Sequence, residues 1–253
     1  MNPQTVPTLV SDALAGHRRA LARLISQIES RAAGSNAAMA AIYPRRLSGP
    51  GHPHVVGITG PPGAGKSTFT DRIITHARAQ NLRVAVVAVD PSSPFSGGAI
   101  LGDRLRMDRH VLDPGVYIRS LSARGHAGGL SRAAGQVVDV LDACGYDLIV
   151  VETVGVGQGE LGVMQVADTV LVVLTPESGD SVQAMKAGLL EIADCFVVNK
   201  ADRPGADALV RELEMAVHLD ARRQWNAPVF AACATDGHGV NEVIAALSRH
   251  REW

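Results

Sequence analysis

The chain has 253 residues, with 24 basic and 25 acidic side chains and a formal net charge of −1. A hydrophobic fraction of 46% excludes a largely disordered chain, and the balanced charge argues against a general nucleic-acid binder, which needs a basic excess. Only three of the basic residues are lysines, namely Lys66, Lys186 and Lys200. The three cysteines lie far apart and form no CxxC pair, which argues against a disulfide framework or a cysteine-based zinc site.

Residues 1–49 are predicted to form a helical extension. Six arginines stand against two acidic residues, Asp12 and Glu29, and apolar residues recur at helical spacing between Leu14 and Ile28. We expect one amphipathic helix here, with Ser11 capping its start. Such a helix packs either on the main domain or against a partner protein, and the sequence leaves both open.

A shorter second helix is predicted over 36–42, ending near Pro44 because proline cannot continue the hydrogen bonding of a helix. The next stretch, 47–54, has the composition of a linker, so we predict a second unit over 50–253. The N-terminus lacks a signal-peptide pattern, and the apolar runs are far shorter than the ~20 residues of a membrane span. We therefore expect a cytoplasmic protein that does not contact membranes.

From residue 54 onward, apolar runs alternate with amphipathic stretches of helical period. The runs show little polar alternation, which is typical of parallel strands covered on both faces. We therefore predict an α/β fold with a doubly wound, mostly parallel sheet. The predicted strands are 54–60, 82–90, 147–153, 169–175, 195–200 and 227–234, and the predicted helices are 67–80, 130–144, 180–193, 204–221 and 240–251.

The strongest motif is Gly60-Pro61-Pro62-Gly63-Ala64-Gly65-Lys66-Ser67, which matches GxxxxGK[ST] between a predicted strand and a predicted helix. The backbone N–H groups of such a loop, with the start of the helix, cradle a phosphate chain. We expect Lys66 to reach the β- and γ-phosphates and the Ser67 hydroxyl to ligate Mg²⁺. Thr68 completes the predicted nucleotide-binding residues of this segment.

The nucleotide base is predicted from Asn199-Lys200-Ala201-Asp202, which follows a predicted strand and fits NKxD. The Asp202 carboxylate can accept hydrogen bonds from the guanine N1–H and NH₂ groups, whereas adenine offers no such pair of donors, so we predict GTP rather than ATP. Asn199 would support the loop and the base edge, and the Lys200 stem would lie over the ring. The segment Ala232-Cys233-Ala234 is predicted to form the last loop that contacts the base.

The predicted Mg²⁺ ligands, together with Ser67, are acidic residues near strand ends. Glu152 ends a predicted strand and could hold the ion through water, while the N–H of Gly155 could contact the γ-phosphate. Asp90 ends another strand, at the edge where ligands bind in such sheets, and Asp103 follows in the next loop. For Asp103, a solvated loop carboxylate is the alternative.

Long blocks of the chain resemble the MeaB/ArgK/MMAA family of P-loop GTPases over roughly residues 50–250. The blocks are GPPGAGKS, VDPSSPFSGGAILGDRLRM, ETVGVGQGE, GDSVQAMKAGLLEIAD and VVNKADRPG. The resemblance implies a GTP-hydrolysing metallochaperone that docks on an adenosylcobalamin-dependent acyl-CoA mutase. It would gate delivery of adenosylcobalamin from an adenosyltransferase and help to eject damaged cofactor. The chain itself is not expected to bind cobalamin, only GTP, GDP and Mg²⁺.

The resemblance also directs attention to Lys186, because it matches a mobile family segment, here 176–188. We expect Lys186 to stabilise developing phosphoryl charge or to orient a triggering contact, beside the catalytic roles predicted for Lys66, Asp90 and Glu152. A solvated helical lysine is the alternative, and Gln158 and Gln183 are weaker candidates. Val156 follows Gly155 where a DxxGQ motif places glutamine. Unassisted hydrolysis should therefore be slow and should accelerate when a partner binds.

Two other functions remain open, a nickel- or zinc-insertion GTPase and a GTP-dependent small-molecule kinase. The first needs soft or imidazole ligands near the switch blocks, where only His126 is found and cysteine is absent. The second needs an acceptor-side base that the sequence does not show. Family members usually continue into a C-terminal dimerisation arm, which we do not find before Trp253. We therefore expect either weak self-association or a dimer built through other surfaces, such as the switch face.

Overall fold

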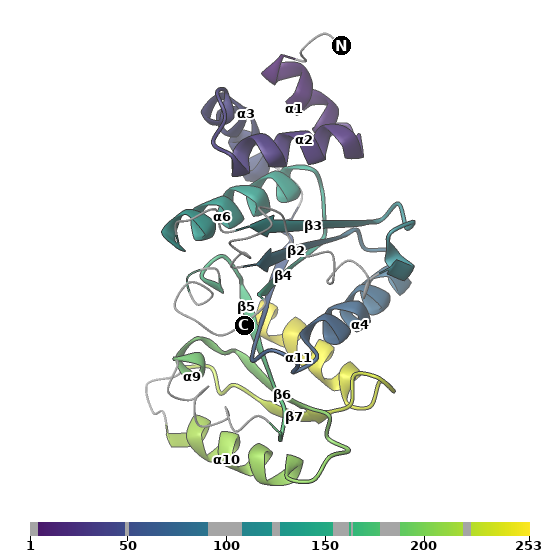
Figure 1. Ribbon diagram of the computed structural model, residues 1–253, viewed down its shortest axis with the longest axis vertical. Coiled ribbons are helices and arrows are strands. Elements are labelled where there is room, and N and C mark those ends of the chain that lie inside the picture. Colours follow the sequence, from purple (N-terminus) through teal and green to yellow (C-terminus); the bar gives the residue numbers. More distant parts are fainter. Residues whose placement is uncertain are drawn as a thin grey trace.

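The computed structural model describes residues 5–48, 51–90, 108–122, 127–153, 162, 164–177, 188–219 and 224–253. Its centre is a seven-stranded sheet of order β3-β2-β4-β1-β5-β6-β7, in which every neighbouring pair is parallel (Figure 1). The strands are β1 (His54–Thr59), β2 (Val84–Asp90), β3 (Val116–Ser122), β4 (Leu148–Thr153), β5 (Thr169–Leu174), β6 (Cys195–Asn199) and β7 (Val229–Ala232).

Helices cover both faces of this sheet. On β2, Val84 and Val86 belong to one apolar core and Ala85 and Val87 to the other, because successive side chains of a strand point to opposite faces. The helices α4 (Lys66–Ala79) and α11 (Val240–Glu252) supply the first core, and α6 (Ala127–Ala143), α9 (Leu189–Ile192) and α10 (Ala206–Leu219) supply the second. The predicted doubly wound α/β class is confirmed.

Three N-terminal helices stack beyond α6, and they too belong to the second core (Figure 1). They are α1 (Val6–Leu14), α2 (Arg18–Glu29) and α3 (Ser35–Ser48). Ion pairs reinforce the packing: Arg46 of α3 lies 2.6 Å from Asp139 of α6, and Arg119 of β3 lies 2.8 Å from Glu29 of α2. Of the two expectations for the extension, this geometry supports packing on the main domain, through α6. The division of the chain at residue 49 stays a prediction.

The single amphipathic helix predicted from Ser11 is wrong. Ser11 lies inside α1, and the chain breaks between Leu14 and Arg18, where Gly16 has a φ of 88°. The amides of Gly16 and His17 bond back to the carbonyls of Ala13 and Asp12, which closes the helix through a left-handed residue that glycine adopts without strain. The glycine after an apolar helical run was the overlooked signal.

The predicted second helix is also wrong in its end, because α3 continues past Pro44. Proline lacks only its own N–H, so one carbonyl a turn earlier loses its usual partner while the rest of the helix persists.

One strand of the sheet, β3, was not predicted from the sequence. β3 is an edge strand that pairs only with β2, and its sequence VYIRSLS mixes buried and polar residues rather than forming an apolar run.

The remaining predicted helices are found with shifts of a few residues at their ends, except that only α9 of the predicted 180–193 helix lies within the described residues. A 3-10 turn, η1 (Asp108–His110), precedes β3.

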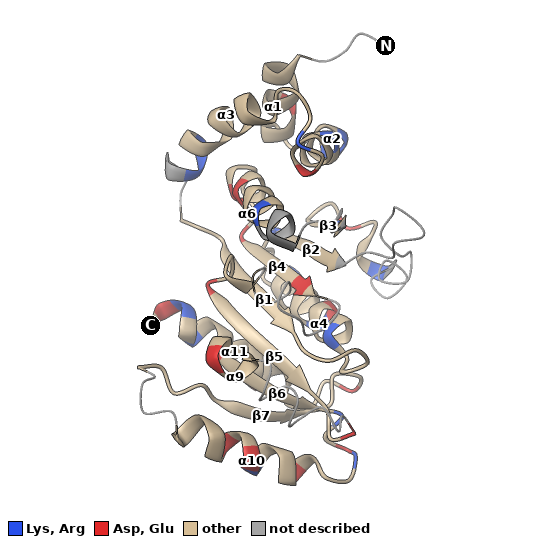
Figure 2. Ribbon diagram, turned by 60° about the vertical axis from the view of Figure 1, so that its left-hand side comes forward, with Lys and Arg blue, Asp and Glu red and all other residues tan. Residues whose placement is uncertain are grey.

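Charged residues of both signs occur on each of the helices α2, α4, α6, α10 and α11, in keeping with the near-zero net charge of the chain (Figure 2). In the part of the chain that the structure describes, no helix combines the length and apolar character that spanning a membrane requires.

Candidate nucleotide-binding site

The loop of residues 60–65 connects β1 to α4 and packs tightly against neighbouring strands. Gly60 has a φ of 144°, and a Cβ there would lie 2.0 Å from the carbonyl oxygen of Val173 on β5. Gly65 has a φ of 90°, and its Cβ would lie 2.3 Å from Nδ2 of Asn199 at the end of β6. Both positions therefore require glycine, since a side chain would collide with the backbone or with a buried amide.

The Lys66 ammonium lies inside this loop. The side chain is 6% exposed, and its Nζ donates hydrogen bonds to the carbonyl oxygens of Gly60 at 2.8 Å and Pro61 at 2.9 Å. The loop thus folds around a cation that its own backbone holds in place. A phosphate chain entering the loop would meet both this charge and the N-terminus of α4.

Ser67 and Glu152, predicted together as Mg²⁺ ligands, are brought together by the fold. The Ser67 hydroxyl on the first turn of α4 donates to Oε1 of Glu152, at the carboxyl end of β4, over 2.6 Å. Thr70, one turn later, donates to Oε2 of Glu152 over 2.7 Å. Ser67 and Glu152 are 6% exposed and Thr70 is fully buried.

These side chains fit a magnesium ion, because Mg²⁺ prefers hard oxygen ligands and binds through few protein groups beside phosphate oxygens. A hydroxyl that donates its proton to a carboxylate keeps its lone pairs for a cation. When bound, the ion would neutralise charge on the nucleotide phosphates. Sequence reasoning missed Thr70, although its position three residues after Ser67 places both on one face of a helix.

The other predicted phosphate and metal residues are less fully placed. The backbone of Asp90 ends β2, at the same edge of the sheet as Glu152, and its side chain lies outside the description. Asp103, Gly155 and Lys186, together with the weaker candidates Gln158 and Gln183, lie outside the described residues.

Asn199 joins the phosphate loop to the predicted base-contacting loop. Its side chain is 4% exposed; Nδ2 donates to the carbonyl oxygen of Ala64 at 2.7 Å, and Oδ1 accepts from the N–H of Ala234 at 3.0 Å. The N–H of Ala201 also bonds the carbonyl of Ala232 at 3.0 Å. The loop of residues 60–65, the NKxD segment and the segment 232–234 were predicted separately from the sequence. In the structure they are joined by the Asn199 side-chain amide and by the backbone bond between Ala201 and Ala232.

The rest of the NKxD segment turns away from the sheet. Lys200 has a left-handed φ of 57°, and its ammonium lies 3.5 Å from a carboxylate oxygen of Glu177, which also pairs with Arg203. Asp202 is exposed in the turn that follows β6, where an incoming base could reach it. Cys233 lies in a short loop, where its backbone N–H donates a hydrogen bond to the carbonyl oxygen of His238 at 2.9 Å.

Arg72 is a further contact that sequence reasoning missed. From α4 it donates through Nε to the carbonyl oxygen of Ala234 at 2.8 Å, and through its terminal nitrogen to the carbonyl of Thr235. Ala234 is thus held on its N–H by Asn199 and on its carbonyl by Arg72. The helix that begins in the phosphate loop also fixes the predicted base loop.

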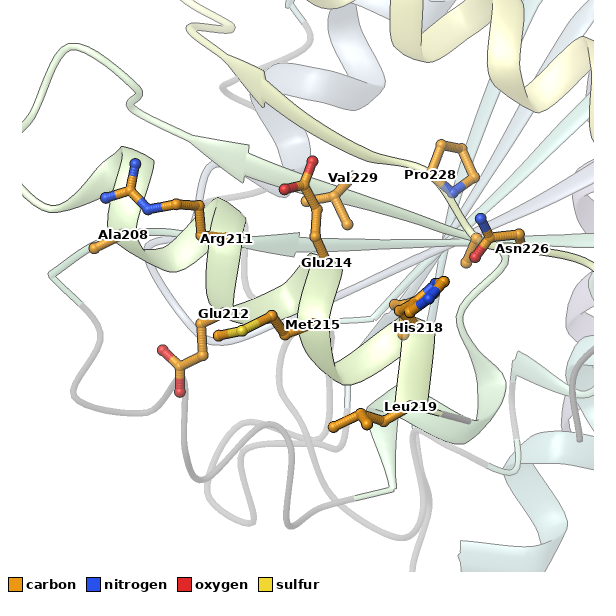
Figure 3. A pocket seen from close by; sticks show the side chains of 12 residues that line it. Ala208, Arg211, Glu212, Glu214, Met215, His218, Leu219, Asn226, Pro228 and Val229 are labelled. Atoms are coloured by element: carbon orange, nitrogen blue, oxygen red, sulfur yellow. The ribbon is translucent and has the colours of Figure 1, made fainter. Parts of the chain in front are cut away.

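A separate groove of about 920 Å³ lies between α10 and the start of β7. Figure 3 shows Met215 and Leu219 beside it, with Arg211, Glu212 and Glu214 on the same helix. It shares no residue with the predicted nucleotide set, so it plays no part in the site described above.

Comparison with known proteins identifies the family. A family model described as Methylmalonyl Co-A mutase-associated GTPase MeaB matches residues 21–253. The chain belongs to the MeaB family. A relative from Pyrococcus horikoshii, named as a GTPase, is 48% identical over 254 residues, covering 99% of this chain and 79% of the relative. A stretch of the fused isobutyryl-CoA mutase of Cupriavidus metallidurans is 38% identical over 224 residues, covering 87% of this chain and 20% of that protein.

Solved structures agree with this assignment. The MeaB-family chain matches a LAO/AO transport system kinase with a TM-score of 0.78 and 29% identity, covering 100% of this chain and 76% of the other. HypB from Helicobacter pylori, solved in complex with nickel, matches with a TM-score of 0.56 and 20% identity, covering 85% and 94%, a likeness of fold alone. The predicted family is confirmed, and the protein is a P-loop GTPase whose fold binds GTP and GDP.

Proposed function

We propose that this MeaB-family GTPase is a chaperone of an adenosylcobalamin-dependent acyl-CoA mutase. GTP binding and hydrolysis would gate the delivery of adenosylcobalamin from an adenosyltransferase and the removal of damaged cofactor. The observation that carries the proposal is the fused isobutyryl-CoA mutase, in which a stretch similar to this chain belongs to a polypeptide named for a mutase. Fusion supports joint action, because a covalent link raises the effective concentration of one partner around the other. The family description names a methylmalonyl-CoA mutase as well.

The proposal assigns roles at the phosphate end of the site. Lys66 binds the phosphates, and Ser67 and Glu152 hold Mg²⁺, with Asp90 and Asp103 as further members of its shell. Gly155 contacts the γ-phosphate. Lys186 stabilises charge in the transition state once the mutase has docked, which is why hydrolysis by the isolated protein should be slow.

At the base end, Asp202 selects guanine, while Asn199 and the loop 232–234 shape the pocket around it. Cobalamin passes between the adenosyltransferase and the mutase without being held by this chain. The protein works in the cytoplasm, with the extension 1–49 placed before a GTPase domain over 50–253.

The experiment is a measurement of GTP hydrolysis by the purified protein alone and with candidate mutases. Methylmalonyl-CoA mutase and isobutyryl-CoA mutase come first, each with and without adenosylcobalamin. The first is named in the family description and the second in the name of a relative. We expect a true partner to accelerate hydrolysis by at least about tenfold, as activating proteins do for other slow GTPases. Rapid hydrolysis by the isolated protein that no acyl-CoA mutase changes would contradict the proposal.

The same assay separates the two alternatives. A nickel- or zinc-insertion GTPase would respond to the metal ion, yet the described part of the chain holds no group of three or more His, Cys, Asp or Glu side chains suited to a metal. A small-molecule kinase would move the γ-phosphate of labelled GTP onto an organic acceptor. Recovery of the label only as inorganic phosphate would argue against the kinase.

A further inference from the structure

The carboxylate of Glu152 is held at both of its oxygens by hydroxyl groups from one helix. Ser67 donates to Oε1 at 2.6 Å and Thr70 donates to Oε2 at 2.7 Å, and the two donors lie three residues apart on α4. Such a pair prevents the carboxylate from rotating about its last carbon–carbon bond. Hydrogen bonds to a carboxylate are also stronger than bonds between neutral groups.

Thr70 itself cannot meet a nucleotide. Its side chain is fully buried, it lies about one helical turn after Ser67 on α4, and its hydroxyl bonds Glu152. The contact that links Thr70 to the predicted metal ligands is its hydrogen bond to the Glu152 carboxylate.

The orientation of Glu152 matters because it sets the direction of the Ser67 hydroxyl. While Oε2 accepts a hydrogen bond from Thr70, Oε1 faces Ser67 and accepts the hydrogen bond of its hydroxyl, which leaves the lone pairs of the Ser67 oxygen for a cation. If Oε2 lost its donor, the carboxylate could turn and share either oxygen with Ser67. The oxygen ligands of Mg²⁺ would then no longer be fixed before the ion arrives, although Mg²⁺ demands near-ideal octahedral geometry.

We propose that Thr70 is a positioning residue for Mg²⁺, acting through Glu152 on the Ser67 hydroxyl. The proposal rests on the Mg²⁺ site of the proposed function but not on any mutase. It predicts that the Thr70 hydroxyl, rather than the volume of the side chain, determines how tightly the site holds the ion.

The test uses the full chain and reads metal binding directly. Mn²⁺ serves as a spectroscopic substitute for Mg²⁺, and its binding to the GDP complex is titrated by electron paramagnetic resonance. The release of a fluorescent GDP is followed in parallel as a function of Mg²⁺ concentration. Thr70→Val removes the hydroxyl at nearly constant shape, and Thr70→Ser retains it. Thr75→Val makes the same exchange five residues further along α4.

We expect Thr70→Val to weaken Mn²⁺ binding by about tenfold or more, the range that a hydrogen bond to a charged group supports. Thr70→Ser should stay within about twofold of the natural protein, and Thr75→Val should match it. In a Glu152→Gln background, Thr70→Val should have little further effect on Mn²⁺ binding, because the coupling runs through the carboxylate.

Equal weakening by Thr70→Val and Thr70→Ser would overturn the proposal, because packing would then explain the effect. The proposal would also be overturned if the Thr70→Val variant bound Mn²⁺ as tightly as the Thr75→Val variant. Should Thr70→Val fail to fold, as judged by its melting curve, Thr70→Ala gives the same comparison without placing a methyl group against the carboxylate. Failure of mutases to stimulate hydrolysis would contradict the proposed function and leave these results unchanged.

Discussion

The two ends of the parallel sheet use buried polar side chains in opposite ways. At the carboxyl end, the buried side chains of Lys66 and Glu152 bond to loop carbonyls and to hydroxyl groups of α4, respectively. At the amino end, His54 of β1 lies 2.8 Å from the Thr169 hydroxyl of β5, which lies 2.9 Å from Nδ1 of His250 on α11. In the first group, Lys66 of α4 bonds the loop of residues 60–65 and Glu152 of β4 bonds α4. In the second group, two strands are joined to the helix α11.

The amino end is closed by aromatic packing. The ring of His250 lies edge-on to Trp225 at 4.8 Å between centroids, and the Trp225 indole donates to the carbonyl of Asp194 at 2.8 Å. Burial, aided by Arg251, lowers the pKa of His54 to about 4, so this imidazole is neutral near pH 7. The neutral His54 and the Thr169 hydroxyl satisfy each other without a buried charge, whereas burying the Lys66 ammonium costs solvation free energy that a bound phosphate would offset. The comparison teaches that buried charge marks the ligand end of this sheet.

The largest expected effect comes from removing the buried charge at the carboxyl end. Lys66→Ala should lower kcat/KM for GTP by at least about 10²-fold, the loss typical of one group that stabilises transition-state charge. Steady-state phosphate release measures it. The melting temperature of the ligand-free protein should change little by comparison. A variant that hydrolyses GTP within a few-fold of the natural rate would contradict the assignment of Lys66.

At the amino end, acid should weaken the fold. Because the folded-state pKa of His54 (about 4) lies below its ordinary value of 6.5, the unfolded chain takes up this proton first as the pH falls. The stabilisation is complete above about pH 6.5 and is lost between pH 6.5 and 4, amounting to at most about 3 kcal/mol.

Urea unfolding of the natural protein and of His54→Gln at several pH values measures this contribution. The variant should show a flatter decline between pH 6.5 and 4, and its GDP affinity at pH 8 should be unchanged. Parallel declines for both proteins would show that His54 does not carry the acid sensitivity.

The base end of the site should change its ligand when Asp202 becomes an amide. Asp202→Asn should weaken GTP binding by roughly 10- to 100-fold, because the NH₂ group of asparagine replaces one of the two carboxylate oxygens that would accept hydrogen bonds from guanine. It should improve binding of XTP, whose 2-oxo group accepts a hydrogen bond from the new amide. Asp207→Asn, the same exchange in the first turn of α10, is the matched control. Unaltered preference for GTP would remove Asp202 from the base site.

The smallest effect is expected for Arg72, since Asn199 still holds the Ala234 loop when the guanidinium is gone. Arg72→Ala should raise KM for GTP by roughly three- to tenfold with little change in kcat, in line with the loss of one or two hydrogen bonds. Full-time-course hydrolysis at several GTP concentrations separates the two constants. A fall in kcat alone would show that Arg72 acts on the chemical step and not on the base loop.

The sequence was sufficient wherever a local pattern decides the structure. The loop of residues 60–65 was predictable because its glycines are required by the backbone itself. The strands β1, β4, β5 and β6 were predictable because each contains a short run of mostly apolar residues. The strand β3 was not, since an edge strand needs apolar residues at only some positions. The predicted function came from the family resemblance, because the periodicity of apolar residues indicates only secondary structure.

Contacts between distant segments were beyond prediction from residues alone. Nothing in the stretch around Thr70 indicates that a carboxylate from β4, 82 residues later, lies against it. The bond from Arg72 to Ala234 spans 162 residues in the same way. Each pair comes together because the strand order β2-β4-β1-β5-β6-β7 places the ends of β4 and β7 on the same side of the sheet as the start of α4.

The side chain of Asn199 has one further consequence. Because a single amide bonds both Ala64 and Ala234, ordering either loop also orders the other. Guanine and phosphate should therefore bind cooperatively, each strengthening the other by the same factor, as thermodynamic linkage requires. Guanosine and inorganic pyrophosphate, offered as two separate molecules, would then each raise the affinity of the protein for the other.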